Sequence, residues 1–531
     1  MFDVLIRGGT VVDGTGAPAR PADVAVEGGR VVAVEPRLAA EGRRTLEADG
    51  LLVAPGFIDI HTHSDFFLLQ VPSAESKLRQ GVTTEVIGMC GFSPAPAVPE
   101  RLALLQDHVA FLAPRLPWDW RGFGEWCARL RGAGLSVNVV PFVGHGAIRI
   151  AAMGFERRPP TPEELRTMEA LVARAMDEGA FGYSTGLVYA PSAFAETEEL
   201  IALARVAAAR GGRYFSHIRG EGPTLETAVA EAIAIGEAAG CPVQIAHLKA
   251  AGRENWPKME AALRALDAAR ARGVEVTADI YPYTAGSTTL SSLLPPWMHD
   301  GGMSRLLERL ADPASRRRLL DECAVGDEGW LAANGRTTWE EVLIAGAPAC
   351  REAEGQTLAA LAQTRGRPGA EVLIEVLLEA RGAVTMVHFL MAEGNVARGL
   401  AHPQVMVGSD SLGLAAGPGP HPGRPHPRMY GTFPRVLGTY VRERRLLGWE
   451  EAIRKMTGMP AATLGLRDRG VIRPGAAADL VVLDPATVAD RAGYEAPHRY
   501  PEGIRWVLVN GAVVLDDGVM RPVPAGRVLT P

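Results

Sequence analysis

Short apolar segments alternate with helical stretches through the middle of this chain of 531 residues. The segments have the length and the β-branched and aromatic content of buried strands, and Ala-, Leu- and Glu-rich sequence separates most of them. This alternation is typical of βα units, whose strands pair in parallel. Eight candidate strands occur: "FIDIHTH", "TTEVIGMC", "VNVVPFVGH", "GYSTGL", "YFSHI", "VQIAHL", "VTADIYPY" and "VMVGSD". Eight such units predict an α/β fold of the (β/α)8 TIM barrel type.

β-rich sequence also occupies both ends of the chain. Residues 1–54 contain Val- and Ile-rich runs between Gly-rich turns, and residues 466–531 repeat this texture, with a hairpin signal, "NG", at 510–511. We expect the two ends to pair into one small β-sandwich domain. The barrel domain is then expected to span residues 55–465.

A long segment interrupts the rhythm between the last two candidate strands. It contains helical sequence, "MSRLLERLADPASRRRLLDECA", and a further apolar run, "VTMVHFLM". We predict an insertion at about residues 284–352, after the seventh strand. Loops that follow barrel strands build the face on which active sites lie.

Composition excludes several classes of protein. The 55 basic and 61 acidic residues are well mixed, so the sequence predicts no nucleic-acid partner. No apolar run approaches the roughly 18 residues of a membrane helix, and the N-terminus reads as a strand and turn rather than a signal peptide. Five irregularly spaced cysteines argue against a disulfide framework and for a reducing compartment. We expect a cytoplasmic protein without a membrane partner.

Histidine, cysteine and aspartate stand at the ends of the candidate strands. On a barrel these ends converge on one face, and imidazole and thiolate are good zinc ligands. A single strand-end histidine is more often structural than a ligand, and a lone buried cysteine is more often a core residue. Several together favour a metal site. The candidates are His61, His63, Cys90, His217, His247 and Asp410.

Motifs along nearly the whole chain resemble one family. "GFIDIHTHSD" with the later histidines and Asp410 looks like the amidohydrolase superfamily. Within it, the sequence is most similar to the N-acyl-D-amino-acid deacylases (D-aminoacylases). The segments that carry this resemblance are "GMCGFSPAP", "YSTGLVYAP", "SHIRGEG", "AHLKAAG", "DIYPYTAGST" and "RPHPRMYGTFPRVLG".

The resemblance implies a metal-dependent hydrolase that uses zinc. Cys90, His217 and His247 would hold one tightly bound ion, and His61 and His63 with Asp410 would form a second, weaker site. Many relatives use a carboxylated lysine after the fourth strand, where "FGYSTGL" offers none. Metal-bound hydroxide would attack the acyl carbonyl, with Asp410 as general base and then acid.

The resemblance also implies residues that bind a small-molecule substrate. Its carboxylate would meet Arg428 and Tyr281, because a guanidinium grips a carboxylate through paired hydrogen bonds. Lys249, Ser287 and Tyr189 would lie nearby. Relatives that act on acidic D-amino acids place a basic residue shortly after this tyrosine. Here "SSLLPPWM" predicts an apolar wall of Leu293, Leu294, Trp297 and Met298, and hence an apolar or neutral D-amino acid with a short acyl group.

Two other functions remain as alternatives. One is a cyclic-amide hydrolase of the hydantoinase or dihydroorotase kind, against which the missing lysine and Cys90 count. The other is a non-catalytic scaffold, against which the complete set of candidate ligands counts. The sequence leaves open the oligomeric state, the exact substrate, and whether the long loop between Asp410 and Arg428 alters the size of the substrate.

Overall fold

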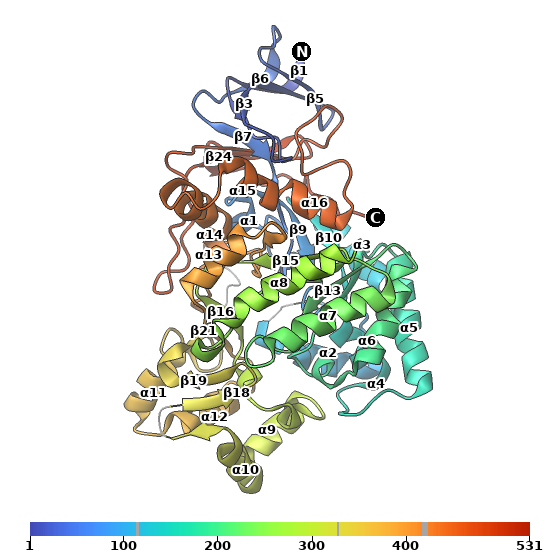
Figure 1. The fold of residues 1–531 in the computed structure, drawn as a ribbon, viewed down its shortest axis with the longest axis vertical. Helices are drawn as coiled ribbons and strands as arrows, with labels where there is room; N and C mark the ends of the chain where they lie inside the picture. Colours follow the sequence, from blue (N-terminus) through green and yellow to red (C-terminus); the bar gives the residue numbers. More distant parts are fainter. Residues whose placement is uncertain (113–115, 327–328, 417–422) are drawn as a thin grey trace.

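The computed structural model describes residues 1–112, 116–326, 329–416 and 423–531. Figure 1 shows strands from both ends of the chain at one pole, a central body of strands and helices, and an inserted unit at the opposite pole. The chain is therefore an α/β protein with additional β-structure from its two ends.

Two all-parallel sheets form the central body. One has the order β10-β9-β8 and the other has the order β11-β12-β13-β14-β15-β22. The strands are β8 (Phe57–Asp59), β9 (Val82–Ile87), β10 (Asn138–Pro141), β11 (Val143–Gly144), β12 (Gly182–Gly186), β13 (Arg213–His217), β14 (Val243–Ile245), β15 (Val276–Ile280) and β22 (Val405–Val407). All eight expected segments contain a strand. The third contains two, β10 and β11, with Phe142 between them.

The two sheets approach each other at both of their open edges. The chain passes from β10 to β11 through the single residue Phe142. At the other edge, the amide of Asp410 donates to the carbonyl of His61, and the amide of His63 donates to the carbonyl of Ser411, both at 2.8 Å. These bonds join the segment after β8 to the segment after β22. The carboxyl ends of the first and last strands therefore meet.

Amphipathic helices cover the outside of these strands (Figure 1). They include α3 (Phe123–Gly132), α4 (His145–Met153), α5 (Pro162–Asp177), α6 (Thr197–Ala208), α7 (Leu225–Ala239), α8 (Lys258–Ala271) and α13 (Glu393–Ala401). Helix α5 shows why such a segment is helical. Thr161 and Glu164 form a capping box at its N-terminus, and Met168, Val172 and Met176 bury one face.

Strands from both ends of the chain share two further sheets. One has the order β5-β4-β1-β6, and the other has the order β26-β25-β24-β23-β7-β2-β3. In the second sheet, β7 (Leu52–Pro55) pairs antiparallel with β23 (Leu480–Leu483), more than 400 residues later in the chain. β24 (Ile504–Val509) and β25 (Ala512–Asp516) flank the "NG" turn. The expected pairing of the two ends is thus present.

The inserted unit extends beyond the predicted residue 352. β16 (Ala285–Thr289) pairs antiparallel with β21 (Thr385–Phe389), and β21 pairs with β20 (Val342–Gly346). A separate apolar cluster runs from Leu290 to Met386. The run "VTMVHFLM" therefore belongs to the insertion, because it contains β21, which pairs antiparallel with β16, the first strand of the insertion. The predicted end of the insertion, at about residue 352, lies before β21, which ends at Phe389.

No helix within the described ranges is both long enough and apolar enough to cross a membrane.

A fully buried lysine lies beneath the meeting point of β8 and β22. Lys77, on the short helix α1 (Glu75–Leu78), has its ammonium 2.8 Å from Asp59 Oδ2. It also donates to the hydroxyls of Ser409, at 2.8 Å, and Ser411, at 2.7 Å. Glu85 of β9 lies 3.4 Å away. One cation thus links β8, β9 and the segment after β22.

Replacing this lysine should destabilise the central body. Lys77→Met leaves the Asp59 carboxylate buried without its cation, which should cost about 3–5 kcal/mol of unfolding free energy. Urea unfolding followed by tryptophan fluorescence measures the difference. Lys258→Met, at a surface lysine that donates to the carbonyl of Pro223, is the control and should change stability by about 0.5 kcal/mol or less. Equal midpoints for the two variants would contradict the assigned role of Lys77.

Candidate active site

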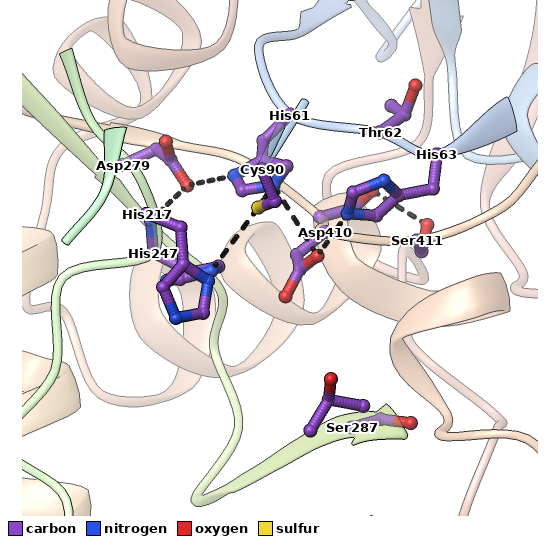
Figure 2. A network of polar contacts seen from close by, with 12 residues as sticks. His61, Thr62, His63, Cys90, His217, His247, Asp279, Ser287, Asp410 and Ser411 are labelled. Atoms are coloured by element: carbon purple, nitrogen blue, oxygen red, sulfur yellow. Dashed lines mark hydrogen bonds and ion pairs between the residues drawn. The ribbon is translucent and has the colours of Figure 1, made fainter. Parts of the chain in front are cut away.

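The six candidate strand-end residues lie together at one edge of the central sheets (Figure 2). His217 ends β13, and the others follow the ends of β8, β9, β14 and β22 by two to four residues. Their donor atoms form overlapping groups within 4.8 Å, namely His61 with Cys90 and His247, His61 with His63 and Asp410, and His217 with His247 and Glu221. The structure therefore brings together every metal-ligating residue predicted from the sequence.

The first group is built around the thiol of Cys90. Its Sγ lies 3.2 Å from Nε2 of His61 and 3.7 Å from Nε2 of His247. The ring of His217 stands edge-on to that of His247, with 4.3 Å between centroids. Neither buried ring nitrogen of His217 makes a hydrogen bond to a described residue. A buried imidazole beside a thiol, with no hydrogen bond of its own, suits a metal ligand.

The second group is built around the carboxylate of Asp410. Its Oδ1 lies 3.3 Å from Nε2 of His63 and 3.5 Å from Nε2 of His61. Its Oδ2 lies 2.7 Å from Nη1 of Arg428. Asp410 therefore faces the imidazoles with one oxygen and the arginine with the other.

Tight turns place three of these side chains. Cys90, His247 and Asp410 have φ values of 53°, 32° and 50°, in the left-handed region that residues with a Cβ rarely adopt. Gly91 continues the turn after Cys90 with φ 75°, and a Cβ there would lie 2.9 Å from the amide of Gly186. The amide of Gly91 donates to Ser184 Oγ in β12. Strained backbone held by its surroundings is typical of functional sites.

The surroundings of the cluster favour the ionised forms of its two acids. Burial alone would raise the pKa of the Cys90 thiol, but the charge of His61, together with the neighbouring imidazoles of His217 and His247, holds it well below its ordinary value. Burial would likewise raise the pKa of Asp410, but Arg428 and His61 hold it well below the ordinary value. A thiolate is the form of cysteine that binds metal. The donor set, of imidazole nitrogens, one sulfur and one carboxylate, fits zinc better than a hard cation.

The predicted substrate-binding residues lie beside the cluster. The Arg428 guanidinium lies over the ring of Tyr281, at 4.9 Å, and donates to the carbonyl of Ser287. The Lys249 ammonium lies 5.8 Å from the same ring. The Tyr189 hydroxyl shares a 2.8 Å hydrogen bond with that of Thr288, next to Ser287 on β16. All five predicted residues thus converge on one side of the cluster.

Two cavities adjoin the cluster. The first, of about 60 Å³, is lined by Cys90, His63, Asp410 and Arg428 together with apolar side chains. The second, also of about 60 Å³, is lined by Lys249, Tyr281, His217 and His247 together with residues of the insertion. Tyr189, Ser287 and Asp410 line both, so they lie at the boundary between the two.

Of the four residues predicted to form an apolar wall for the substrate, one lines the second cavity. Leu293 lines the second cavity, as expected. Leu294 and Met298 are instead buried in the core of the insertion, and the Trp297 indole donates to Glu322 and stacks on Arg318. These three residues were wrongly assigned because the core of the insertion also needs apolar side chains.

Two acidic residues of the site were not identified from the sequence. Glu221 Oε1 lies 3.0 Å from Nδ1 of His247 and also contacts the Lys249 ammonium. Asp279 Oδ1 lies 3.3 Å from Nδ1 of His61. Carboxylates that contact the far nitrogen of a ligating histidine fix its tautomer and orientation. The available signal was their position in "SHIRGEG" and "ADIYPY", at or just beyond strand ends like the histidines themselves.

The structure describes residues 411–416 and 423–427 of the long loop between Asp410 and Arg428, and residues 417–422 lie outside the described ranges.

Comparisons with known proteins identify the family. The amidohydrolase family model matches residues 44–515. N-acyl-D-glutamate deacylase of Alcaligenes xylosoxydans xylosoxydans is 40% identical over 99% of this chain and 96% of its own length. A D-aminoacylase studied for its binuclear metal centre is 39% identical, with a TM-score of 0.84 over the whole of both chains. The N-acyl-D-glutamate deacylase of Bordetella bronchiseptica, solved with zinc and a phosphonate mimic of the tetrahedral intermediate, is 38% identical, again with a TM-score of 0.84 over both whole chains. This chain therefore belongs to the amidohydrolase family and, within it, to the N-acyl-D-amino-acid deacylases.

Proposed function

We propose that this protein is a zinc-dependent hydrolase that cleaves the amide bond of N-acyl-D-amino acids, giving a carboxylate and a free D-amino acid. The observation that carries the proposal is the cluster of Cys90, four histidines and Asp410 beside the Arg428 guanidinium. It combines ligands for a metal, a candidate base and a cation for the substrate carboxylate. Relatives that share about two fifths of its residues bear the names of such deacylases.

We infer that the two parallel sheets form one (β/α)8 barrel, because hydrogen bonds join the segments after β8 and β22 and β10 continues into β11. The barrel domain comprises residues 55–465, including the insertion. Residues 1–54 and 466–531 form one β-sandwich, since an apolar cluster that includes Val4, Val24, Leu480 and Leu508 lies between their sheets.

Cys90, His217 and His247 would hold one tightly bound zinc ion, and His61 and His63 with Asp410 a second, weaker one. Zinc when bound supplies a water of low pKa and polarises the acyl carbonyl. Relatives with a binuclear metal centre and with zinc support the presence of a metal centre here. Asp279 and Glu221 orient His61 and His247 through their Nδ1 atoms.

Asp410 is the proposed general base and acid. It lies at the junction of both ligand groups, with Oδ1 toward the imidazoles. In this position it takes a proton from the attacking water and delivers it to the departing amine nitrogen, which must be protonated for the C–N bond to break. Arg428 keeps the carboxylate ionised until it accepts that proton.

Arg428 and Tyr281 bind the substrate carboxylate. Lys249, Ser287 and Tyr189 form the rest of the substrate-binding surface. Arg428 and Lys249 are each held by an internal carboxylate, Asp410 and Glu221 respectively. Those contacts fix the two cations in place, so little side-chain entropy is lost when the substrate arrives. The D side chain would lie in the second cavity, against Leu293, Met386 and Leu390. These three apolar side chains support a neutral D-amino acid, although Ser292, Asn334 and His388 also line the cavity.

The two alternatives receive less support. A cyclic-amide hydrolase with a carboxylated lysine is disfavoured because β12 carries none and Cys90 lies within the cluster. A scaffold without catalysis is disfavoured because the candidate ligands fall into overlapping groups whose donor atoms lie within 4.8 Å of one another. The five free cysteines, all buried, support a cytoplasmic location.

The choice of enantiomer and side chain provides the main test. Paired N-acetyl-D and N-acetyl-L derivatives of Leu, Phe, Met and Glu are incubated with the enzyme and added zinc, and amine release is measured. We expect hydrolysis of the D forms of Leu, Phe and Met, and kcat/KM for the D-Glu form lower by about tenfold to a hundredfold, because its side-chain carboxylate would be buried without a partner. Equal rates on D and L forms contradict the function; a preference for D-Glu contradicts the side-chain assignment.

Asp410→Asn removes the proposed base and preserves the shape of the side chain. We expect kcat to fall by about 10²–10⁴-fold while the tightly bound zinc is retained. Asp267→Asn is the matched control, at a surface residue that contacts His402, and should leave kcat unchanged. Retention of more than one tenth of the wild-type kcat by Asp410→Asn would show that another group transfers the proton.

Cys90→Ala removes the thiolate from the tighter site. We expect loss of tightly bound zinc and of activity with little change in far-UV circular dichroism, measured alongside the metal content of the purified protein. Cys241→Ala is the control, because burial raises the pKa of that thiol to about 11 and the residue lies away from the cluster. If Cys90→Ala keeps both zinc and activity, Cys90 is a core residue and not a ligand.

A further inference from the structure

The first cavity beside the metal cluster has an apolar lining that the proposed mechanism does not use. Besides His63, Cys90, Asp410 and Arg428, its walls include Phe92, Phe111, Leu112, Leu412 and Met429. We call these five apolar residues the apolar chamber. They come from the turn after β9, the segment η3 (Ala110–Leu112), the segment after β22 and helix α14 (Arg428–Arg435). An apolar chamber that opens on a reacting centre is suited to a hydrocarbon group of the substrate.

The order of groups in the substrate determines which group enters the chamber. In an N-acyl-D-amino acid the scissile carbonyl lies between the acyl tail and the α-carbon, which bears the carboxylate and the side chain. Lys249, Tyr281 and Leu293 line the second cavity. Arg428 lines the first, but its guanidinium lies over the ring of Tyr281, on the side of the second cavity. With the carbonyl at the metal cluster and the amino-acid part in the second cavity, the acyl tail points into the chamber.

A hydrogen bond keeps the two cavities apart. The Tyr189 hydroxyl, from the loop after β12, meets that of Thr288, from β16 of the insertion, at 2.8 Å. Both residues line both cavities. This link separates the acyl tail from the D side chain, so each should be selected by its own wall.

Phe92 forms the side of the chamber that faces a third cavity. Its ring packs on His108, at 4.6 Å, Tyr189, at 5.0 Å, and Phe111, at 5.4 Å. Beside it lies this third cavity, of about 50 Å³, which Phe92 and Phe111 also line and to which His108 and Phe155 contribute. The Phe92 ring is therefore a partition between two cavities, and its removal would join them.

We propose that the apolar chamber binds the hydrocarbon tail of the acyl group, that it accepts tails longer than acetyl, including aromatic ones, and that Phe92 determines the longest tail accommodated. The proposal rests on the proposed deacylase function. It extends the short acyl group expected from the sequence, because a cavity of about 60 Å³, several times the roughly 10–15 Å³ that one water needs, exceeds what a methyl group fills.

A series of acyl lengths on one amino acid tests the chamber. N-acetyl-, N-butanoyl-, N-hexanoyl-, N-octanoyl- and N-phenylacetyl-D-leucine are compared by kcat/KM. In the wild type we expect a rise of about fourfold per methylene until the tail meets Phe92, since each buried methylene contributes a similar increment. In Phe92→Ala the rise should continue to longer tails. A wild-type profile that is flat or falls from acetyl onward overturns the proposal.

A second series separates the two cavities. N-acetyl derivatives of D-Ala, D-Leu and D-Phe are assayed with wild type, Phe92→Ala, Phe111→Ala and Leu293→Ala. Substitutions in the chamber should change the profile of the acyl series alone, and Leu293→Ala should change that of the amino-acid series alone. The reverse pattern assigns the chamber to the D side chain and overturns the proposal. Zinc content and melting temperature of each variant identify any that has lost its fold.

Binding of free octanoate gives a readout that is independent of turnover. Calorimetry should show binding to the wild type, and tighter binding of decanoate than octanoate by Phe92→Ala or, if that variant is unstable, by Phe111→Ala. Absence of binding to every folded protein overturns the chamber. Failure of the wild type to hydrolyse any acyl-D-amino acid while octanoate binds refutes the proposed function and leaves the chamber in place.

Discussion

The buried ion pair between Lys77 and Asp59 is the interaction on which the geometry of the site depends. Asp59 precedes His61 by two residues, and the hydroxyls of Ser409 and Ser411, on either side of Asp410, accept hydrogen bonds from the same ammonium. The attraction within a buried charge pair offsets its desolvation cost only when the two groups are held in good geometry. The first and last strands of the central body are therefore held in one register, and the imidazoles meet the Asp410 carboxylate in that register.

Buried carboxylates beside the site also pair with the histidines and the lysine that line it. Asp279 contacts His61, and Glu221 contacts both His247 and Lys249. Each is buried, so each charge needs a partner, and the histidine or lysine that supplies it becomes fixed in orientation. Arg428 is fixed in the same way by Asp410. The side chains proposed to bind metal and substrate are thus positioned by charge neutralisation before any ligand arrives.

The sequence predicted what local patterns encode. Apolar strands followed by His, Cys or Asp located all six residues of the cluster, because in parallel βα units the strand ends gather at one edge. It did not predict Glu221 and Asp279, because the segment of an acid near a strand end does not reveal which histidine elsewhere in the chain it contacts. The end of the insertion was misjudged because "VTMVHFLM" has the composition of any buried strand, and its antiparallel pairing with β16 is non-local. Leu294, Trp297 and Met298 were misplaced for a related reason, since apolar character does not distinguish a cavity wall from a core.

The turn at residues 89–92 positions both the thiol of Cys90, a proposed metal ligand, and the ring of Phe92, which lines the apolar chamber. Left-handed backbone at Cys90 and Gly91 directs the thiol toward the imidazoles and places the Phe92 ring in the wall of the apolar chamber. The amide of Phe92 donates to the carbonyl of Met89, and the amide of Gly91 donates to Ser184, so this backbone is held independently of the Phe92 side chain. Changing the size of the residue at 92 can therefore alter the depth of the chamber without moving the thiol. Within this fold, the choice of acyl group can vary while the metal ligand one turn away stays fixed.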